Sequence, residues 1–179
     1  MILKVRENLE LRVRAPEEAA ETFAVIDKNR EYLREWLPWV DATNSVEDVK
    51  KVIEKWQKEF AGKKDVVLGI YLDDKYVGNM GLHDINRNNS SAMIGYWLAE
   101  DAQGQGIMTD CVRALSSYGF NELDLNRIYI LCASGNTKSR AIPERLGYIQ
   151  EGVLRDGTRL YGIYHDEVIY GALKRNWGK

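Results

Sequence analysis

Two closely spaced glycines in the middle of the chain stand between an apolar run and a helical pattern. The apolar run, Met93 to Leu98, contains two aromatic residues and predicts a buried strand. Gln103-Gly104-Gln105-Gly106 follows it, and Val112, Leu115 and Tyr118 then recur at helical intervals. Glycines let the backbone approach an anion closely, and the first turn of a helix offers unpaired N–H groups and the positive end of its dipole. The order of strand, glycine loop and helix therefore predicts a polyphosphate site.

The loop lacks residues that two common nucleotide motifs require. A Walker loop needs Gly-Lys followed by Ser or Thr, and this loop contains no lysine. A dinucleotide-binding motif needs a third glycine, whereas Gly106 is followed by Ile107, Met108 and Thr109. The loop is therefore unlike both a Walker loop and a dinucleotide-binding motif. The alternative to a polyphosphate site is an ordinary turn between a strand and a helix.

A second pattern lies further along the chain. Asn136-x-x-Ser139 precedes a short helical stretch that ends in Leu146-Gly147-Tyr148. With Ile94-Gly95-Tyr96-Trp97-Leu98 and the glycine loop before it, this order of motifs resembles the GCN5-related N-acetyltransferase (GNAT) superfamily, which binds acetyl-coenzyme A. Met108 replaces the small residue usual in the loop, which resembles the RimJ/RimL branch, whose members acetylate N-termini of ribosomal proteins.

The resemblance implies an α/β (α+β) GNAT fold in a single domain, residues 1–179. Its central sheet is expected to be mixed, mostly antiparallel and seven-stranded, with one parallel splayed pair and about four flanking helices. The pattern places strands at Leu9–Val13, Val66–Leu72, Tyr76–His83, Met93–Leu98, Arg127–Ala133, Tyr148–Leu160 and Glu167–Leu173. Helices are expected from Ala15, from a Ser45 cap to Gly62, after Gly106, and from Ser139 to Leu146.

Composition narrows the class of protein further. A formal net charge of −2 argues against coating a nucleic acid. The apolar runs are too short for a bilayer span, and the first residues lack the features of a signal peptide, so we expect a cytoplasmic protein without a membrane partner. Cys111 and Cys132 lie in apolar patterns without a His/Cys cluster, so we expect buried free thiols, no disulfide and no metal.

The resemblance also implies where acetyl-CoA, the expected co-substrate, binds. The pantetheine arm pairs with the strand edge near Tyr96 to Ala99, the pyrophosphate lies over the glycine loop, and Asn136 contacts the arm unless it merely forms a turn. Lys138, Arg140 or Arg145 meets the ribose phosphate. The cofactor-binding residues implied are Trp97, Leu98, Ala99, Gln103, Gly104, Gln105, Gly106, Ile107, Met108, Thr109, Asn136, Lys138, Ser139 and Arg140.

In this chemistry an amine attacks the thioester directly, without a covalent enzyme intermediate. The resemblance makes Ser139 the candidate proton donor to departing coenzyme A, and the alternative is that Ser139 caps the short helix. His83 and Glu100 are the candidate general bases.

Other positions are weaker candidates for the base. His165-Asp166 is expected in a turn between the last two strands. RimL-type enzymes are thought to use a glutamate where this chain offers Asp156, so a dedicated base could be absent.

The acceptor is open between three hypotheses. Trp36, Trp39 and Tyr96 are the candidate substrate-binding residues, although such aromatics also anchor cores. The acceptor is expected to be the N-terminus of a ribosomal protein. The first alternative is a polyamine or other small amine, held by Asp41, Glu47 and Asp48. The second alternative is that the protein is a CoA-binding module without turnover. RimL-like relatives commonly form dimers, so we expect a homodimer or higher homo-oligomer, in which the tail Lys174–Trp177 could take part.

Overall fold

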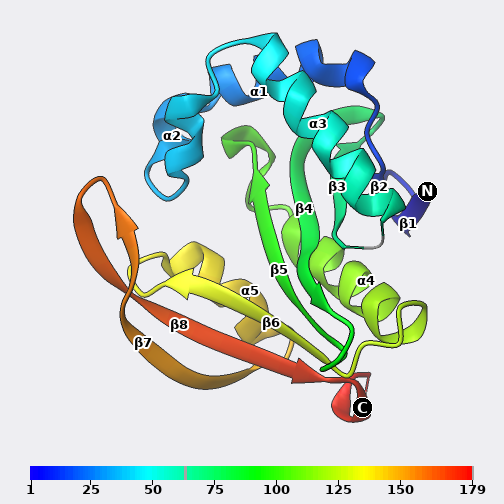
Figure 1. The fold of residues 1–179 in the computed structure, drawn as a ribbon, viewed down its shortest axis with the longest axis vertical. Helices are drawn as coiled ribbons and strands as arrows, with labels where there is room; N and C mark the ends of the chain where they lie inside the picture. The colour runs from blue at the N-terminus through cyan, green and yellow to red at the C-terminus, as the bar shows by residue number, and fades with distance from the viewer. Residues whose placement is uncertain (63, 179) are drawn as a thin grey trace. The chain divides into compact units, whose positions relative to one another are not determined.

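The computed structural model describes residues 1–62 and 64–178. Their strands form one hydrogen-bonded sheet in the order β1-β2-β3-β4-β5-β6-β8-β7 (Figure 1). The strands are β1 Ile2–Arg6, β2 Leu9–Arg12, β3 Val66–Leu72, β4 Lys75–Asn86, β5 Ser91–Leu98, β6 Arg127–Ala133, β7 Ile149–Leu160 and β8 Ile163–Leu173. The α-helices in these residues are α1 Ala19–Lys28, α2 Arg30–Arg34, α3 Val46–Ala61, α4 Ile107–Asn121 and α5 Thr137–Arg145. Short 3-10 helices are η1 Pro16–Glu18, η2 Pro38–Ala42, η3 Glu100–Ala102 and η4 Lys174–Asn176.

The chain divides into two compact units, which are described separately. The first unit comprises Met1–Gly81 and Tyr96–Ile107, and the second comprises Leu82–Gly95 and Met108–Lys179. None of the helices in the described residues combines the length and apolar character needed to cross a bilayer.

The first unit is built on two antiparallel hairpins. Leu9 and Leu11 of β2 are buried, as their alternation predicts, and β2 pairs with both β1 and β3. Asp73 and Asp74 join β3 to β4 with φ angles of 48° and 62°. Positive φ at both central residues suits a two-residue hairpin, because the twist of such a turn matches that of the strands.

Strand β1 raises the number of strands in the sheet to eight, so the predicted seven was one too few. Its burial alternates only between exposed and half-buried, which leaves a weak hydrophobic pattern, and its pairing with β2 supplies the hydrogen bonds instead. The five-residue helix α2 was also not predicted; it is too short to show a helical period.

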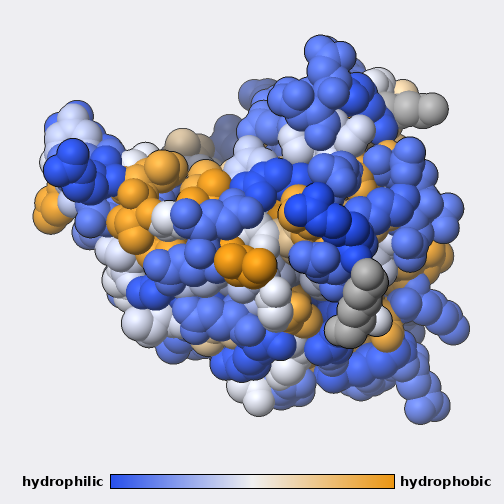
Figure 2. Space-filling model, turned by 90° about the horizontal axis from the view of Figure 1, so that it is seen from below, coloured by the Kyte–Doolittle hydropathy of each residue, from blue (hydrophilic) through white to orange (hydrophobic). Residues whose placement is uncertain are grey.

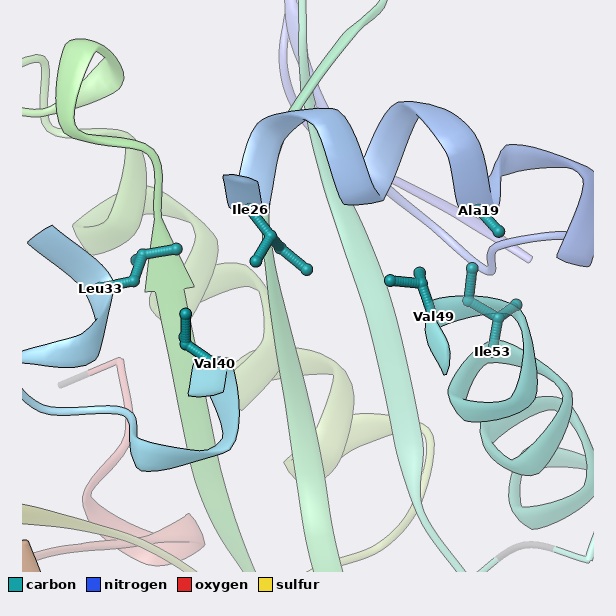
Figure 3. Packing of buried hydrophobic residues seen from close by; sticks show 6 residues of the cluster. All are labelled: Ala19, Ile26, Leu33, Val40, Val49 and Ile53. Atoms are coloured by element: carbon teal, nitrogen blue, oxygen red, sulfur yellow. The ribbon is translucent and has the colours of Figure 1, made fainter. Parts of the chain in front are cut away.

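A cluster of six buried side chains forms the core beneath the helices of the first unit (Figure 3). They come from α1, α2, η2 and α3: Ala19, Ile26, Leu33, Val40, Val49 and Ile53. The predicted start of α3 is confirmed, since Ser45 Oγ accepts the Asp48 N–H at 3.2 Å and Asp48 Oδ2 accepts the Asn44 N–H at 3.1 Å. Val52 on this helix is 40% exposed.

The second unit contains the parallel pair. Strands β5 and β6, which helix α4 connects, are the one parallel pair that the resemblance implies, and β8 and β7 follow in antiparallel order. Helix α4 packs closely on β6, because a Cβ at Gly119 would lie 2.8 Å from Ile128 Cδ1. The tail is tied to the same helix: Trp177 donates to Ser117 Oγ at 2.9 Å and its ring lies 5.5 Å from that of Phe120.

The last hairpin differs from the prediction. β8 begins at Ile163, so His165 and Asp166 lie inside a strand, and the turn is formed by Tyr161 and Gly162 with φ angles of 50° and 86°. The turn prediction for His165-Asp166 was therefore wrong. Polar residues such as His165 and Asp166 resemble loop residues in sequence, and only the pairing with β7 identifies them as strand.

Candidate active site

The glycine loop has the backbone geometry that its sequence predicts. Gly104 and Gly106 have φ angles of 76° and 73°, in the left-handed region that favours glycine. A Cβ at either position would have no atom within 4 Å, so the space beside the backbone is open. Because α4 begins at Ile107, its first N–H groups follow the loop directly. Ile107 and Met108 are buried, so the unusual methionine serves packing.

Residues around the end of α1 hold the segment that leads into this loop. The Gln103 side-chain amide donates to the Tyr32 hydroxyl, and the Glu100 N–H donates to Asn29 Oδ1 at 2.9 Å. Lys28 pairs with Asp101 at 2.7 Å, and this hydrogen bond lowers the pKa of the Asp101 carboxyl. Sequence analysis did not identify Tyr32, which the chain separates from Gln103 by 71 positions.

Close approach of two strands shapes the end of β5. A Cβ at Gly78 would lie 2.3 Å from the Trp97 carbonyl oxygen, and the Ala99 N–H donates to the Val77 carbonyl at 2.8 Å. The Trp97 ring packs against the core cluster and lies 6.1 Å from the ring of Trp39. The Trp97 side chain is thus part of the core, and only its backbone remains suited to the predicted cofactor contact.

The predicted acceptor-binding residues differ in their exposure to solvent. Trp39 is 38% exposed, whereas Trp36 and Tyr96 are half-buried. Contact with Trp97 ties Trp39 to the first unit while leaving part of its ring accessible. Trp39 is therefore an anchor of the first unit, and its role in binding the acceptor stays a prediction.

The parallel ladder of the second unit is short. It pairs Ser91 to Met93 with Arg127 to Tyr129 and ends there, while β6 continues to pair with β8 as far as Ala133. An early end to this ladder is what the predicted splay requires, because an extended ligand needs a strand edge to pair with.

The start of α5 lies beside the last residues of β6. Asn136 is the N-cap of α5, and its Oδ1 accepts the Ser139 N–H at 3.1 Å. The alternative in which Ser139 caps this helix is therefore wrong. Ser139 Oγ lies 3.2 Å from Cys132 Sγ on β6, which directs the hydroxyl toward the strand.

The predicted phosphate-binding cations differ in their surroundings. Arg140 donates to the Tyr170 hydroxyl and to the Ser134 carbonyl, both at 3.0 Å, and the first of these bonds raises the pKa of Arg140. Lys138 is exposed, and Arg145 Nη1 lies 3.5 Å from Thr109 Oγ1 on α4. Arg140 is thus committed within the second unit, whereas Lys138 and Arg145 lie at the surface.

The surroundings of the predicted general bases do not favour one of them over the others. Glu100 is exposed in η3. His83 is half-buried on β4, and a Cβ at Gly95 would lie 3.3 Å from its ring. Asp156 is exposed. One half-buried carboxylate that sequence analysis did not single out, Glu167 on β8, has a pKa raised by burial.

No group of His, Cys, Asp and Glu residues suited to a metal ion occurs within residues 1–62 and 64–178. Cys111 and Cys132 are buried, as predicted, and neither belongs to a disulfide.

Comparison with known proteins gives a consistent result. A model of the acetyltransferase (GNAT) domain matches residues 8–149. The chain is 38% identical over 175 residues to the putative ribosomal N-acetyltransferase YdaF of Bacillus subtilis, covering 97% of this chain and 96% of that protein. It is 31% identical over 175 residues to the ribosomal-protein-serine acetyltransferase of Escherichia coli, covering 96% of each.

Two solved structures are similar over nearly the whole chain. RimL, a ribosomal L7/L12 α-N-protein acetyltransferase in complex with coenzyme A, matches with a TM-score of 0.93 and 28% identity, covering 97% of this chain and 98% of that one. The microcin C7 self-immunity acetyltransferase MccE, in complex with acetyl-CoA and AMP, matches with a TM-score of 0.91 and 29% identity, covering 95% and 94%.

The two roles available to Asn136 can be separated by substitution. Asn136→Ala removes the cap and is expected to lower the free energy of unfolding by about 1 kcal/mol, whereas Asn136→Asp keeps an acceptor oxygen and the stability. If the Asn136 amide also donates to the cofactor arm, both variants bind acetyl-CoA more weakly. Calorimetry and chemical denaturation measure the two effects; wild-type affinity in Asn136→Asp would show that Asn136 is a cap alone.

Proposed function

Because the chain belongs to the acetyltransferase (GNAT) family and is an acetyl-CoA-dependent N-acetyltransferase, we propose that its acceptor is the N-terminal α-amine of a ribosomal protein. The observation that carries this proposal is that its match to two relatives named for ribosomal substrates extends over 96% or more of the chain. We propose further that the enzyme acts in the cytoplasm, as a single domain without nucleic-acid or membrane partners.

The proposed site for the pyrophosphate of acetyl-CoA is the backbone of residues 104–109. The residues fit this ligand, since Gly104 and Gly106 leave open space and the 15-residue helix α4 starts immediately after them. Gln103 then positions the loop through Tyr32 rather than by contact with phosphate. Lys138 and Arg145 are the cations proposed for the ribose phosphate.

Acetyl-CoA supplies an activated acyl group as its thioester. The chain must then orient the arm, deliver a neutral amine and protonate the departing thiolate. Backbone groups of Trp97, Leu98 and Ala99 are proposed to pair with the arm, in the manner of an added strand. Ser139 is proposed as the proton donor, supported by its half-buried hydroxyl beside Cys132 and by the finding that Asn136, not Ser139, caps α5.

A polyamine acceptor is less well supported. Of the three carboxylates suggested for it, Asp41 forms an ion pair with Arg34 at 2.9 Å, and Asp48 accepts hydrogen bonds at the start of α3. These hydrogen bonds lower the pKa of the Asp41 carboxyl and of the Asp48 carboxyl. Of the three carboxylates, Glu47 then remains for a polyamine. An acidic pocket for a polycation needs several available carboxylates, so a protein N-terminus is the better fit.

The acceptor is testable directly. Ribosomal proteins incubated with the enzyme and isotopically labelled acetyl-CoA are expected to gain one acetyl group at an N-terminus, detected by mass spectrometry of N-terminal peptides. Spermidine at the same concentration is expected to release less free thiol than the peptide that becomes labelled. Label on spermidine alone would contradict the proposed acceptor, and cofactor binding without transfer to any amine would indicate a CoA-binding module.

The role of the glycine loop is tested by Gly106→Ala. Alanine at a φ of 73° is strained, and its methyl group would occupy the space proposed for phosphate. We expect acetyl-CoA to bind about tenfold more weakly or worse, a change of roughly 1.4 kcal/mol. Gly147→Ala is the matched control, because Gly147 has a φ of 76° and equally open surroundings. Equal weakening in both variants would point to general strain rather than a phosphate site.

We also propose that two copies of the chain associate through the β7–β8 hairpin. β7 is an edge strand, and large apolar side chains are exposed on this hairpin, which lies at the left of Figure 2. They are Ile149, Val153, Leu154, Tyr161, Ile163 and Tyr164. The tail is a weaker candidate than expected, because Trp177 packs on α4.

Ile163→Lys tests the proposed dimer. Ile163 is 64% exposed, so lysine is tolerated in a monomer but places an unpaired charge in the contact. Sedimentation velocity is expected to show a dimer for the wild type and a monomer for this variant. Val52→Lys, at a 40% exposed position of α3, should leave the dimer intact. A monomeric wild type would refute the proposal.

A further inference from the structure

An irregularity in the β7–β8 ladder creates a distinct environment at its centre. Leu154 pairs with Glu167, and the next pair is Thr158 with His165, so residues 155–157 of β7 face Asp166 alone. The bulge is held in place by Asp166, whose Oδ1 accepts the Asp156 N–H at 2.9 Å, and Asp156 takes a φ of 51°. Such bulges redirect side chains and are frequent beside active sites.

Glu167 lies against this bulge. A Cβ at Gly157 would be 3.1 Å from both the Cβ and Oε2 of Glu167, so the absence of a side chain at Gly157 leaves room for the carboxylate. Within residues 1–62 and 64–178, the Glu167 side chain forms no hydrogen bond and no ion pair, although the residue is half-buried. Burial raises the pKa of its carboxyl. A partly desolvated carboxylate without a partner is unfavourable for stability, and such groups are concentrated at functional sites.

The ladder places Glu167 and Ser139 on opposite faces of the sheet. Cys132 pairs with Val168, and Ala133 pairs with Glu167, so these are neighbouring pairs. Directly paired residues point to the same face, and successive residues alternate. Since Cys132 Sγ contacts Ser139 Oγ, Ser139 lies on the face of Cys132, and Glu167 projects from the other face. Both positions lie at the end of β6, beyond the point where its parallel ladder with β5 stops.

We infer that Glu167 is the general base that removes a proton from the ammonium group of the acceptor. The inference rests on the proposed N-acetyltransferase reaction, which needs one group to protonate the departing thiolate and another to take a proton from the amine. The position and chemistry of Glu167 suit this step, whereas Glu100 is exposed in η3.

The proton balance of the step is complete. Glu167 takes one proton from the ammonium, and the neutral nitrogen forms a bond to the acetyl carbon. The carbon–sulfur bond breaks, Ser139 donates its proton to the thiolate, and the second nitrogen proton replaces it. Protonated Glu167 then releases its proton to water, so one ammonium ion and one thioester give one amide, one thiol and one proton.

The ionisable groups near Glu167 in the ladder come from β7 and β8. His165 lies two residues away on the same face of β8, and Arg155 and Asp156 are exposed in the bulge of β7. On the β6 side, Ala133 and Leu131 carry no charge.

The test substitutes Glu167→Gln, which keeps the shape and removes the base. At pH 7 we expect kcat to fall about 100-fold or more with the Kd of acetyl-CoA unchanged. The loss should shrink as pH rises past about 8, where an N-terminal amine is neutral without help, and Glu167→Asp should restore part of the rate. A merely structural role would lower kcat by the same factor at every pH.

The matched control is Glu151→Gln. Glu151 pairs with Arg127 at 2.5 Å, and a Cβ at Gly171 would meet both side chains, which places them on the same sheet face as Glu167. Its kcat should stay within about twofold of the wild type. A Glu167→Gln enzyme with more than half of the wild-type kcat at pH 7 would overturn the assignment.

The inference can fail independently of the proposed acceptor. If ribosomal N-termini are not acetylated, the same variants are assayed with whichever amine releases thiol from acetyl-CoA. If no amine does, the carboxyl carbons of 13C-labelled glutamate are titrated by NMR, and the Glu167 signal is assigned by its loss in Glu167→Gln. A pKa above the ordinary value of about 4.3 supports the assignment, and an ordinary value overturns it.

Discussion

Unequal pairing of β6 is the constraint on which the second unit depends. With β5 the strand pairs only from Arg127 to Tyr129, whereas with β8 it pairs along its whole length to Ala133. Main-chain N–H and C=O groups need partners, so a strand edge released from its neighbour is suited to an extended ligand. Ser139 and Glu167 are placed on opposite faces of this strand end because side chains alternate along it.

The first unit holds the glycine loop in position and supplies none of the proposed reactive side chains. Three consecutive contacts, from Lys28 to Asp101, from Asn29 to the Glu100 N–H and from Tyr32 to Gln103, fasten the segment that precedes the glycines. Binding of a polyphosphate by main-chain N–H groups depends on their being held in position before the ligand arrives. Fastening the segment through side chains leaves those N–H groups available.

In the β7–β8 hairpin, a bulge and a glycine together make room for a half-buried carboxylate. Asp166 stabilises the bulge by accepting a main-chain hydrogen bond, Gly157 leaves the space, and Glu167 occupies it without a partner among the described residues. Desolvation makes such a carboxylate more basic than usual, which brings it closer to the range where proton transfer from an amine is efficient. The same carboxylate on a regular exposed strand would be an ordinary surface acid.

Local patterns in the sequence determined the family, the glycine loop before α4, strand β6 and the capped start of α3, because each depends on neighbouring residues such as Ser45 and Asp48. Only the tertiary structure decided that β1 joins the sheet, that Asn136 rather than Ser139 caps α5, and that Glu167 is half-buried beside a bulge. Ladder register and burial arise from residues that are distant in sequence, such as Ala133 and Glu167, and no local period records them.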